Sequence, residues 1–155
     1  SNHRLLICGA KKPFQHESFE QVSTQDLPFN VQDIKLLSCG SNHIVVVTQQ
    51  NEIYSAGDNS FGQLGIGNTT AQDKFTKWKV IGNKGKEWDN IEQLICGMNS
   101  TAIITTTSNS DDSNNDKRQQ QQIFVCGSNE HGMLALGDRY KSELYVPVFT
   151  RVNLP

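Results

Sequence analysis

The stretch that decides the fold runs from Ile53 to Gly67 and reads IYSAGDNSFGQLGIG; the stretch before it, Leu36 to Thr48, reads LLSCGSNHIVVVT. Both stretches recur along the chain. The short apolar run that ends at Gly57 returns at residues 5–9 and 123–127, and the run that ends at Gly40 returns 57 residues later, ending at Gly97. Repeats of this length built from short units are typical of propellers, in which each repeat forms one small antiparallel sheet.

A polar insertion accounts for the one irregular spacing. The run ending at Gly57 returns only after 70 residues, and the 13 extra residues lie within Ser108–Gln122, which reads SNSDDSNNDKRQQQQ. This segment has no apolar residue, so it cannot bury enough surface to offset the entropy lost on ordering. The sequence therefore predicts a disordered polar insertion over residues 108–122, between two strands.

The elements between the repeat marks have the composition of strands. Residues 44–48 and 101–105 are short, rich in β-branched side chains and bounded by Gly, Asn and Ser. No stretch carries apolar residues at helical spacing over three turns, and no apolar run approaches the ~18–20 residues of a membrane span. The expected fold class is all-β, made of four-stranded antiparallel propeller blades.

These residues resemble the repeats of the regulator of chromosome condensation family. The pattern of aliphatic, small, small, Gly, two variable residues, His and aliphatic is met from Leu37 to Val47. The pattern Gly-x-Asn-x-x-Gly-Gln-Leu-Gly-x-Gly is met in full from Gly57 to Gly67. The resemblance covers nearly all of residues 1–155 outside the insertion, and it implies a seven-bladed propeller. With fewer than three repeats, we expect an incomplete ring, part of a larger polypeptide.

The resemblance assigns structural roles to the repeat positions, with glycines providing positive φ and close packing. These positions are Gly9, Gly40, His43, Gly57, Asn59, Gly62, Gln63, Leu64, Gly65, Gly67, Gly97, Gly127, Gly132 and Gly137. The later copy departs from the pattern at three positions. Met133 replaces Gln, Ala135 replaces Gly, and Ser100 takes the place that His43 has in the earlier copy. The fold expectation tolerates these changes, whereas the transfer of a specific activity does not.

Catalytic, metal and cofactor sites are not expected. The glycines run in the reverse order of a dinucleotide fingerprint, and no Lys-Ser/Thr pair follows them. Each cysteine directly precedes a repeat glycine, where Ala56 stands in the remaining copy, and no C-x-x-C pair occurs. We interpret Cys8, Cys39, Cys96 and Cys126 as small buried hydrophobes, which favours a reducing intracellular compartment, cytoplasmic or nuclear.

Five residues are candidates for contact with a partner: Asp58, Phe61, Lys77, Trp78 and His131. Asp58, Phe61 and His131 lie in the predicted repeat loops, and Lys77 and Trp78 lie in the one basic and aromatic stretch, residues 74–88. Within it, Trp78-Lys79-Val80-Ile81 is also compatible with an outer strand whose edge is blunted by lysines. The net charge of −2 provides no global positive field, so nucleic acid is not the expected partner.

The function expected from the sequence is non-enzymatic recognition of a protein, by variable loops held on rigid blades. The family resemblance leaves two alternatives open. One is a guanine-nucleotide exchange factor for a Ran-type small GTPase, and the other is the regulatory propeller of a larger ubiquitin ligase or kinase. A protein partner, including a small GTPase, and self-association through open blade faces are expected; a membrane is not.

Overall fold

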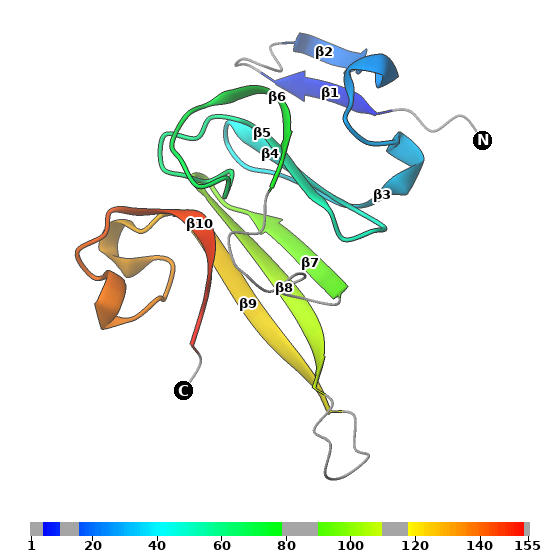
Figure 1. The fold of residues 1–155 in the computed structure, drawn as a ribbon. Coiled ribbons are helices and arrows are strands. Elements are labelled where there is room, and N and C mark those ends of the chain that lie inside the picture. Colours follow the sequence, from blue (N-terminus) through cyan, green and yellow to red (C-terminus); the bar gives the residue numbers. More distant parts are fainter. Residues whose placement is uncertain (1–4, 10–15, 79–89, 110–117, 154–155) are drawn as a thin grey trace.

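The computed structural model describes residues 5–9, 16–78, 90–109 and 118–153. In these ranges the chain forms antiparallel strands joined by turns and short 3₁₀ segments (Figure 1). The strands are β1 (Leu6–Gly9), β2 (His16–Gln21), β3 (Ile34–Cys39), β4 (His43–Thr48), β5 (Ile53–Gly57), β6 (Gln72–Lys77), β7 (Asn90–Cys96), β8 (Ser100–Asn109), β9 (Arg118–Ser128) and β10 (Tyr145–Arg151). The 3₁₀ segments are Thr24–Asp26, Val31–Asp33, Glu130–Gly132 and Asp138–Tyr140.

The strands form a hairpin and two four-stranded sheets. Strands β3-β4-β5-β6 make the first blade and β7-β8-β9-β10 the second, while β1 and β2 pair as an N-terminal hairpin. All pairings are antiparallel. Figure 1 shows the hairpin and the two blades following one another across the molecule. The prediction of four-stranded antiparallel blades is confirmed, and the described sheets do not close into a ring.

The same backbone contact marks the end of each outer strand pair. The amide of Trp78 donates to the carbonyl of Ile53 at 2.9 Å, and that of Val152 donates to Ile123 at 2.8 Å. In the hairpin, Val22 donates to Leu5 at 2.9 Å. The hairpin therefore corresponds to the outer two strands of a blade, as β5–β6 and β9–β10 do.

The main core lies between the two blades. Strand β4 is buried along its whole length, as expected for a β-branched central strand. Val45, Val47 and Ile53 of the first blade belong to one buried cluster with Ile103 and Phe124 of the second. A smaller cluster lies within the second blade and its own loop; its buried members are Val125, Leu134, Val146 and Val152. Packing between blades thus holds the two repeats together.

The β8–β9 ladder extends further than the sequence predicts. Ser108 pairs with Gln119 and Asn109 with Arg118, so both ends of the segment expected to be disordered are strand. Residues 110–117 lie outside the described part of the chain. Ladder pairing uses backbone groups and needs no apolar side chains, which is why this polar segment can continue it. Glu92 of β7 also accepts hydrogen bonds from Thr106 and, at 2.9 Å, from the Gln121 amide.

Candidate functional site

The loop after β5 is held by one buried asparagine. Asn59 is fully buried, and its Nδ2 donates to the carbonyls of Asn68 at 2.8 Å and Thr70 at 3.1 Å. Its Oδ1 accepts from the amide of Leu64 at 3.0 Å. One side chain therefore ties both ends of the loop together, so this repeat position is structural.

The second blade uses the same arrangement. Asn129 Nδ2 donates to the carbonyls of Tyr140 at 2.9 Å and Glu143 at 3.0 Å, and Oδ1 accepts from Leu134 N at 3.2 Å. Both loops leave their blade at equivalent places, because Gly57 pairs with His43 and Gly127 pairs with Ser100. The blades thus present two similarly braced loops at corresponding strand ends, which together form the loop rim, residues 58–71 and 128–144.

The carboxylate of Asp58 is used inside its own loop. Its Oδ1 accepts from the amide and hydroxyl of Ser60 at 3.1 and 2.6 Å, and its Oδ2 accepts from Gln63 Nε2 at 3.0 Å. Desolvation acts to raise the pKa of Asp58, but these hydrogen bonds outweigh it and leave the pKa below its usual value. The Gln63 Oε1 in turn accepts from Phe61 N at 2.9 Å. The side chains of Asp58 and Gln63 therefore shape the turn.

Two repeat glycines of the first blade lie against the second blade. A Cβ on Gly62 would lie 2.4 Å from Pro147 Cα, and one on Gly65 would lie 2.6 Å from Phe149 Cε2. Both glycines have positive φ, 76° and 70°. Beside them, Gly67 N donates to the carbonyl of Pro147 at 2.9 Å. These glycines provide both the turn and the surface on which β10 packs.

The remaining repeat glycines lie at strand ends and turns. Gly57 and Gly127 have φ of 110° and 111°, and a Cβ on either would lie 2.3 Å from a carbonyl oxygen, that of Asn42 or Asn99. Gly9 ends β1, while the amides of Gly40 and Gly97 donate to the carbonyls of His43 and Ser100 at 2.8 and 2.9 Å. Gly40 and Gly97 therefore close the tight turns that precede β4 and β8.

His43 lies in the joint between the blades. Its side chain is 3% exposed, and its Nε2 is 3.0 Å from the hydroxyl of Thr101. That hydroxyl donates to the carbonyl of Gln63 at 2.7 Å, which leaves the imidazole Nε2–H as the donor to Thr101. Burial lowers the pKa of His43 from 6.5 to about 4, although Asp58 and a backbone contact with Ser100 act in the opposite direction. The ring is therefore a neutral structural link.

The cysteines differ in burial. Cys126 is fully buried in the joint, Cys96 is half-buried, and burial raises the pKa of both thiols, that of Cys96 to about 11. Cys39 is exposed, so the interpretation of every cysteine as a buried hydrophobe is wrong at this position. The side chain of Cys8 lies outside the described part of the chain. Among described residues, no three metal-ligating side chains are grouped to hold an ion.

The structure separates the five partner candidates into two places. Asp58, Phe61 and His131 lie on the loop rim, where His131 is exposed and Phe61 half-buried. Lys77 lies at the far end of β6, paired with Glu52 at 2.5 Å. Trp78 is only 9% exposed and packs edge-on against Phe149, with ring centroids 5.7 Å apart.

Trp78 directly follows the last residue of β6, Lys77. Its side chain belongs to the buried cluster between the blades that includes Phe149 of β10, so Trp78 is a core residue. The outer strand is Gln72–Lys77, so it ends just before the candidate outer strand that the sequence suggested from Trp78 to Ile81. The rest of the basic and aromatic stretch, residues 79–88, lies outside the described residues.

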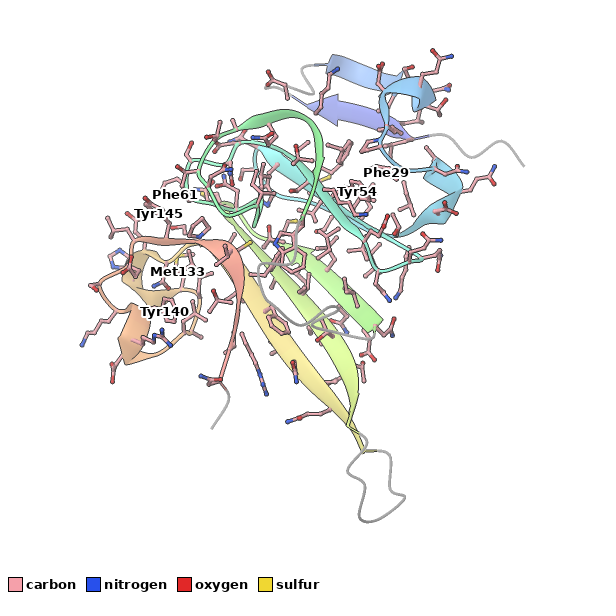
Figure 2. All side chains as sticks on the ribbon, in the orientation of Figure 1. Phe29, Tyr54, Phe61, Met133, Tyr140 and Tyr145 are labelled. Carbon is pink, nitrogen blue, oxygen red and sulfur yellow. The ribbon has the colours of Figure 1, made fainter. Side chains whose placement is uncertain are left out.

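Sequence reasoning missed exposed apolar residues next to the rim. Leu144, the last residue of the second rim loop, is 68% exposed, and Tyr145, the first residue of β10, is 44% exposed. Figure 2 labels Tyr145 beside Phe61, and the contact of Gly62 with Pro147 brings these two segments together. The available signal was Pro147, since proline within a strand pattern marks an edge strand. We call Phe61, Leu144 and Tyr145 the rim patch.

The comparisons with known proteins agree with this geometry. The family model for the regulator of chromosome condensation (RCC1) repeat matches residues 34–63, which contain β3, β4, β5 and the start of the first loop. The chain belongs to the RCC1-repeat family. The X-linked retinitis pigmentosa GTPase regulator of Mus musculus is 32% identical to this chain over 122 residues, 79% of the chain and 10% of that protein.

Two further likenesses extend the match. The human probable E3 ubiquitin-protein ligase HERC6 is 28% identical over 148 residues, 92% of this chain and 13% of the ligase. The crystal structure of Prp20p from Saccharomyces cerevisiae, described with its binding to Gsp1p and histones, superposes with a TM-score of 0.51 at 19% identity. It covers 79% of this chain and 27% of Prp20p, a likeness of fold. The RCC1-repeat chain thus spans about a tenth of the length of the GTPase regulator and of HERC6.

No helix in the described part of this RCC1-repeat chain is long and apolar enough to cross a membrane.

Proposed function

We propose that this chain is a non-enzymatic protein-interaction module that contacts its partner through the loop rim. The observation that carries the proposal is the rim patch, where a half-buried phenylalanine and the exposed Leu144 and Tyr145 stand beside two braced loops. Large aromatic and aliphatic side chains on a rigid support are enriched at the centres of protein interfaces. Because Asn59 and Asn129 fix the loops, little ordering entropy would be lost on binding.

The partner class that the comparisons support best is a small GTPase. One relative is named as a GTPase regulator, and Prp20p is described as binding Gsp1p and histones. Both are much longer than the matched region, so the proposal for this chain concerns binding and not nucleotide exchange. Exchange activity is the first alternative. The second is a regulatory role beside a ubiquitin ligase or kinase, supported by the likeness to HERC6.

The test measures the binding of a Ran-type GTPase and of histones to the immobilised chain by interferometry. Tyr145→Glu places a charge in the rim patch and should weaken binding at least about tenfold, the range of a moderate interface contact. Gln50→Glu is the matched control, because Gln50 is exposed in the turn at the opposite end of β4 and β5. Equal binding by both variants, or no binding of either probe, contradicts the proposal.

A parallel assay separates binding from exchange. Fluorescent nucleotide is loaded on the GTPase, and its release is followed with the chain in excess. The interaction-module proposal expects binding with nucleotide release at the background rate. Acceleration by orders of magnitude would instead establish the exchange-factor alternative.

A further inference from the structure

The hairpin of β8 and β9 extends past the other strands of its blade. Strand β9 pairs with β10 only as far as Phe124, whereas its pairing with β8 continues to Arg118. Figure 1 shows this two-stranded extension projecting beyond the neighbouring strands. In the first blade the equivalent hairpin is short, because β5 begins at Ile53, the residue that corresponds to Ile123. The extension therefore belongs to the longer hairpin of the second blade, and we call residues 118–122 of β9 the arm edge.

The arm edge carries backbone groups that point away from β8. Ile123 directs its carbonyl to the side of β10, because it accepts from the amide of Val152 at 2.8 Å. The hydrogen-bonding direction of backbone groups alternates from one residue to the next along an antiparallel strand. Gln119 and Gln121 therefore direct their N–H and C=O groups to the same side as Ile123, and no strand in the described ranges pairs with them there.

Residues 119–122 lack the charge and the proline that usually protect a strand edge from pairing with another chain. They are consecutive glutamines, whereas β10, the outer strand of the same blade, carries Pro147. The side chains of Gln120 and Gln121 are exposed. A glutamine amide both donates and accepts, so glutamines that face one another across a strand pair can form hydrogen bonds. This segment is thus complementary to a second copy of itself.

We infer that the arm edge pairs with the arm edge of a second copy of this chain, antiparallel and about a two-fold axis at Gln120. In this register Gln119 of each copy lies opposite Gln121 of the other, so the residues with outward backbone groups face each other on both sides of the axis. Each of these pairs exchanges both N–H···O bonds. The contact is isologous, as in most homodimers, because the same residues contribute from both copies.

This contact leaves the loop rim free, and it does not depend on the identity of the rim's partner. The rim loop of the second blade begins at Ser128, the last residue of β9, whereas the arm edge begins at Arg118, the first. The two surfaces therefore lie at opposite ends of one strand. A dimer joined through the arm edges presents two rims, so a partner with two binding sites would be held with greater avidity than by one copy.

Cysteine cross-linking of the intact chain tests the register. Residues opposite one another in a non-hydrogen-bonded antiparallel pair have Cα atoms about 4.5 Å apart, which suits a disulfide. Gln120→Cys places a thiol beside its own copy on the axis, whereas Gln121→Cys, the matched control, lies opposite Gln119. Both variants also carry Cys39→Ser, because Cys39 is exposed.

Oxidised glutathione serves as the oxidant, and mass spectrometry of the cross-linked peptides identifies the bond. Gln120→Cys should form its disulfide-linked dimer at least about tenfold faster than Gln121→Cys, since only the thiols at residue 120 meet at disulfide distance. Equal rates for the two variants, or no cross-link in either, would overturn the inference.

Proline substitution tests the backbone hydrogen bonds. Gln119→Pro removes an outward N–H without removing a donor to β8, and Gln119→Ala, the control, keeps that N–H. Sedimentation equilibrium up to millimolar concentration should show a monomer–dimer equilibrium for the unsubstituted chain. Gln119→Pro should weaken dimerisation at least about tenfold, because each dimer loses one hydrogen bond from both copies, and Gln119→Ala should weaken it less than about threefold. A monomer at every concentration, or equal dimerisation of both variants, contradicts the inference.

Discussion

Alanine at Gly62 tests whether the repeat glycines serve the joint between blades or only their own turn. The residue has φ of 76°, and an added Cβ would lie 2.4 Å from Pro147 Cα and 3.0 Å from Pro147 N. These are backbone atoms, so β10 must shift to make room. Holding alanine in the left-handed region costs about 1–2 kcal/mol, and overpacking costs about 1–3 kcal/mol more. We expect Gly62→Ala to lower the free energy of unfolding by about 3 kcal/mol.

Gly132→Ala is the matched control for this experiment. Its φ is 73°, and a Cβ there would have nothing within 4 Å, so only the backbone cost of about 1–2 kcal/mol applies. Both variants are measured by urea unfolding with linear extrapolation, which also reports whether the slope changes. The reasoning is refuted if the two substitutions cost the same, because the contact with Pro147 would then contribute nothing.

Three other predictions follow from the joint and the β8–β9 ladder. Because the pKa of His43 is lowered from 6.5 to about 4, the folded state loses up to about 3 kcal/mol as pH falls from 6.5 to 4; urea unfolding of His43→Gln should lack this part of the pH dependence. The exposed Cys39 should react with a thiol reagent in the native protein, and the buried Cys126 only after denaturation, without prior reduction; mass spectrometry of labelled peptides reports both. Deleting residues 109–121 should lower the free energy of unfolding by at least about 1 kcal/mol, because it removes the Gln121 contact with Glu92 and the pairing of β9 residues 118–121 with β8, whereas deleting residues 110–117 should lower it by less than about 0.6 kcal/mol; equal losses on unfolding would contradict this.

The sequence was sufficient to predict the blades because their strands are defined by local patterns. The run His43–Thr48 is β-branched between turn residues, and the glycines that follow β5 mark positive φ, both of which are properties of short segments. The joint could not be predicted in the same way. Nothing near Gly62 indicates that Pro147 packs against it, because the contact joins residues far apart in sequence.

Trp78 is a second residue whose environment could not be predicted from the local sequence. Next to lysines, a tryptophan in a basic stretch is typical of an exposed binding surface, and that local context suggested a partner site. The structure buries the ring against Phe149 of the second blade, a residue some 70 positions away. Lys77 remains at the surface in the same strand end, so the two neighbours have opposite environments although their sequence context is shared.

In each loop, one buried asparagine holds the backbone, and other positions can differ between repeats. Asn59 and Asn129 make equivalent hydrogen bonds, so the backbone of each loop is set without the residues that face the neighbouring blade. The change from Gly65 in the first loop to Ala135 in the second, where φ stays positive at 54°, therefore alters a surface that can face a neighbouring blade while the turn is retained. The turns at residues 62–67 and 132–137 thus carry different side chains on one backbone conformation, and differences of this kind would let the loop rim suit a particular partner without disturbing the blade beneath it.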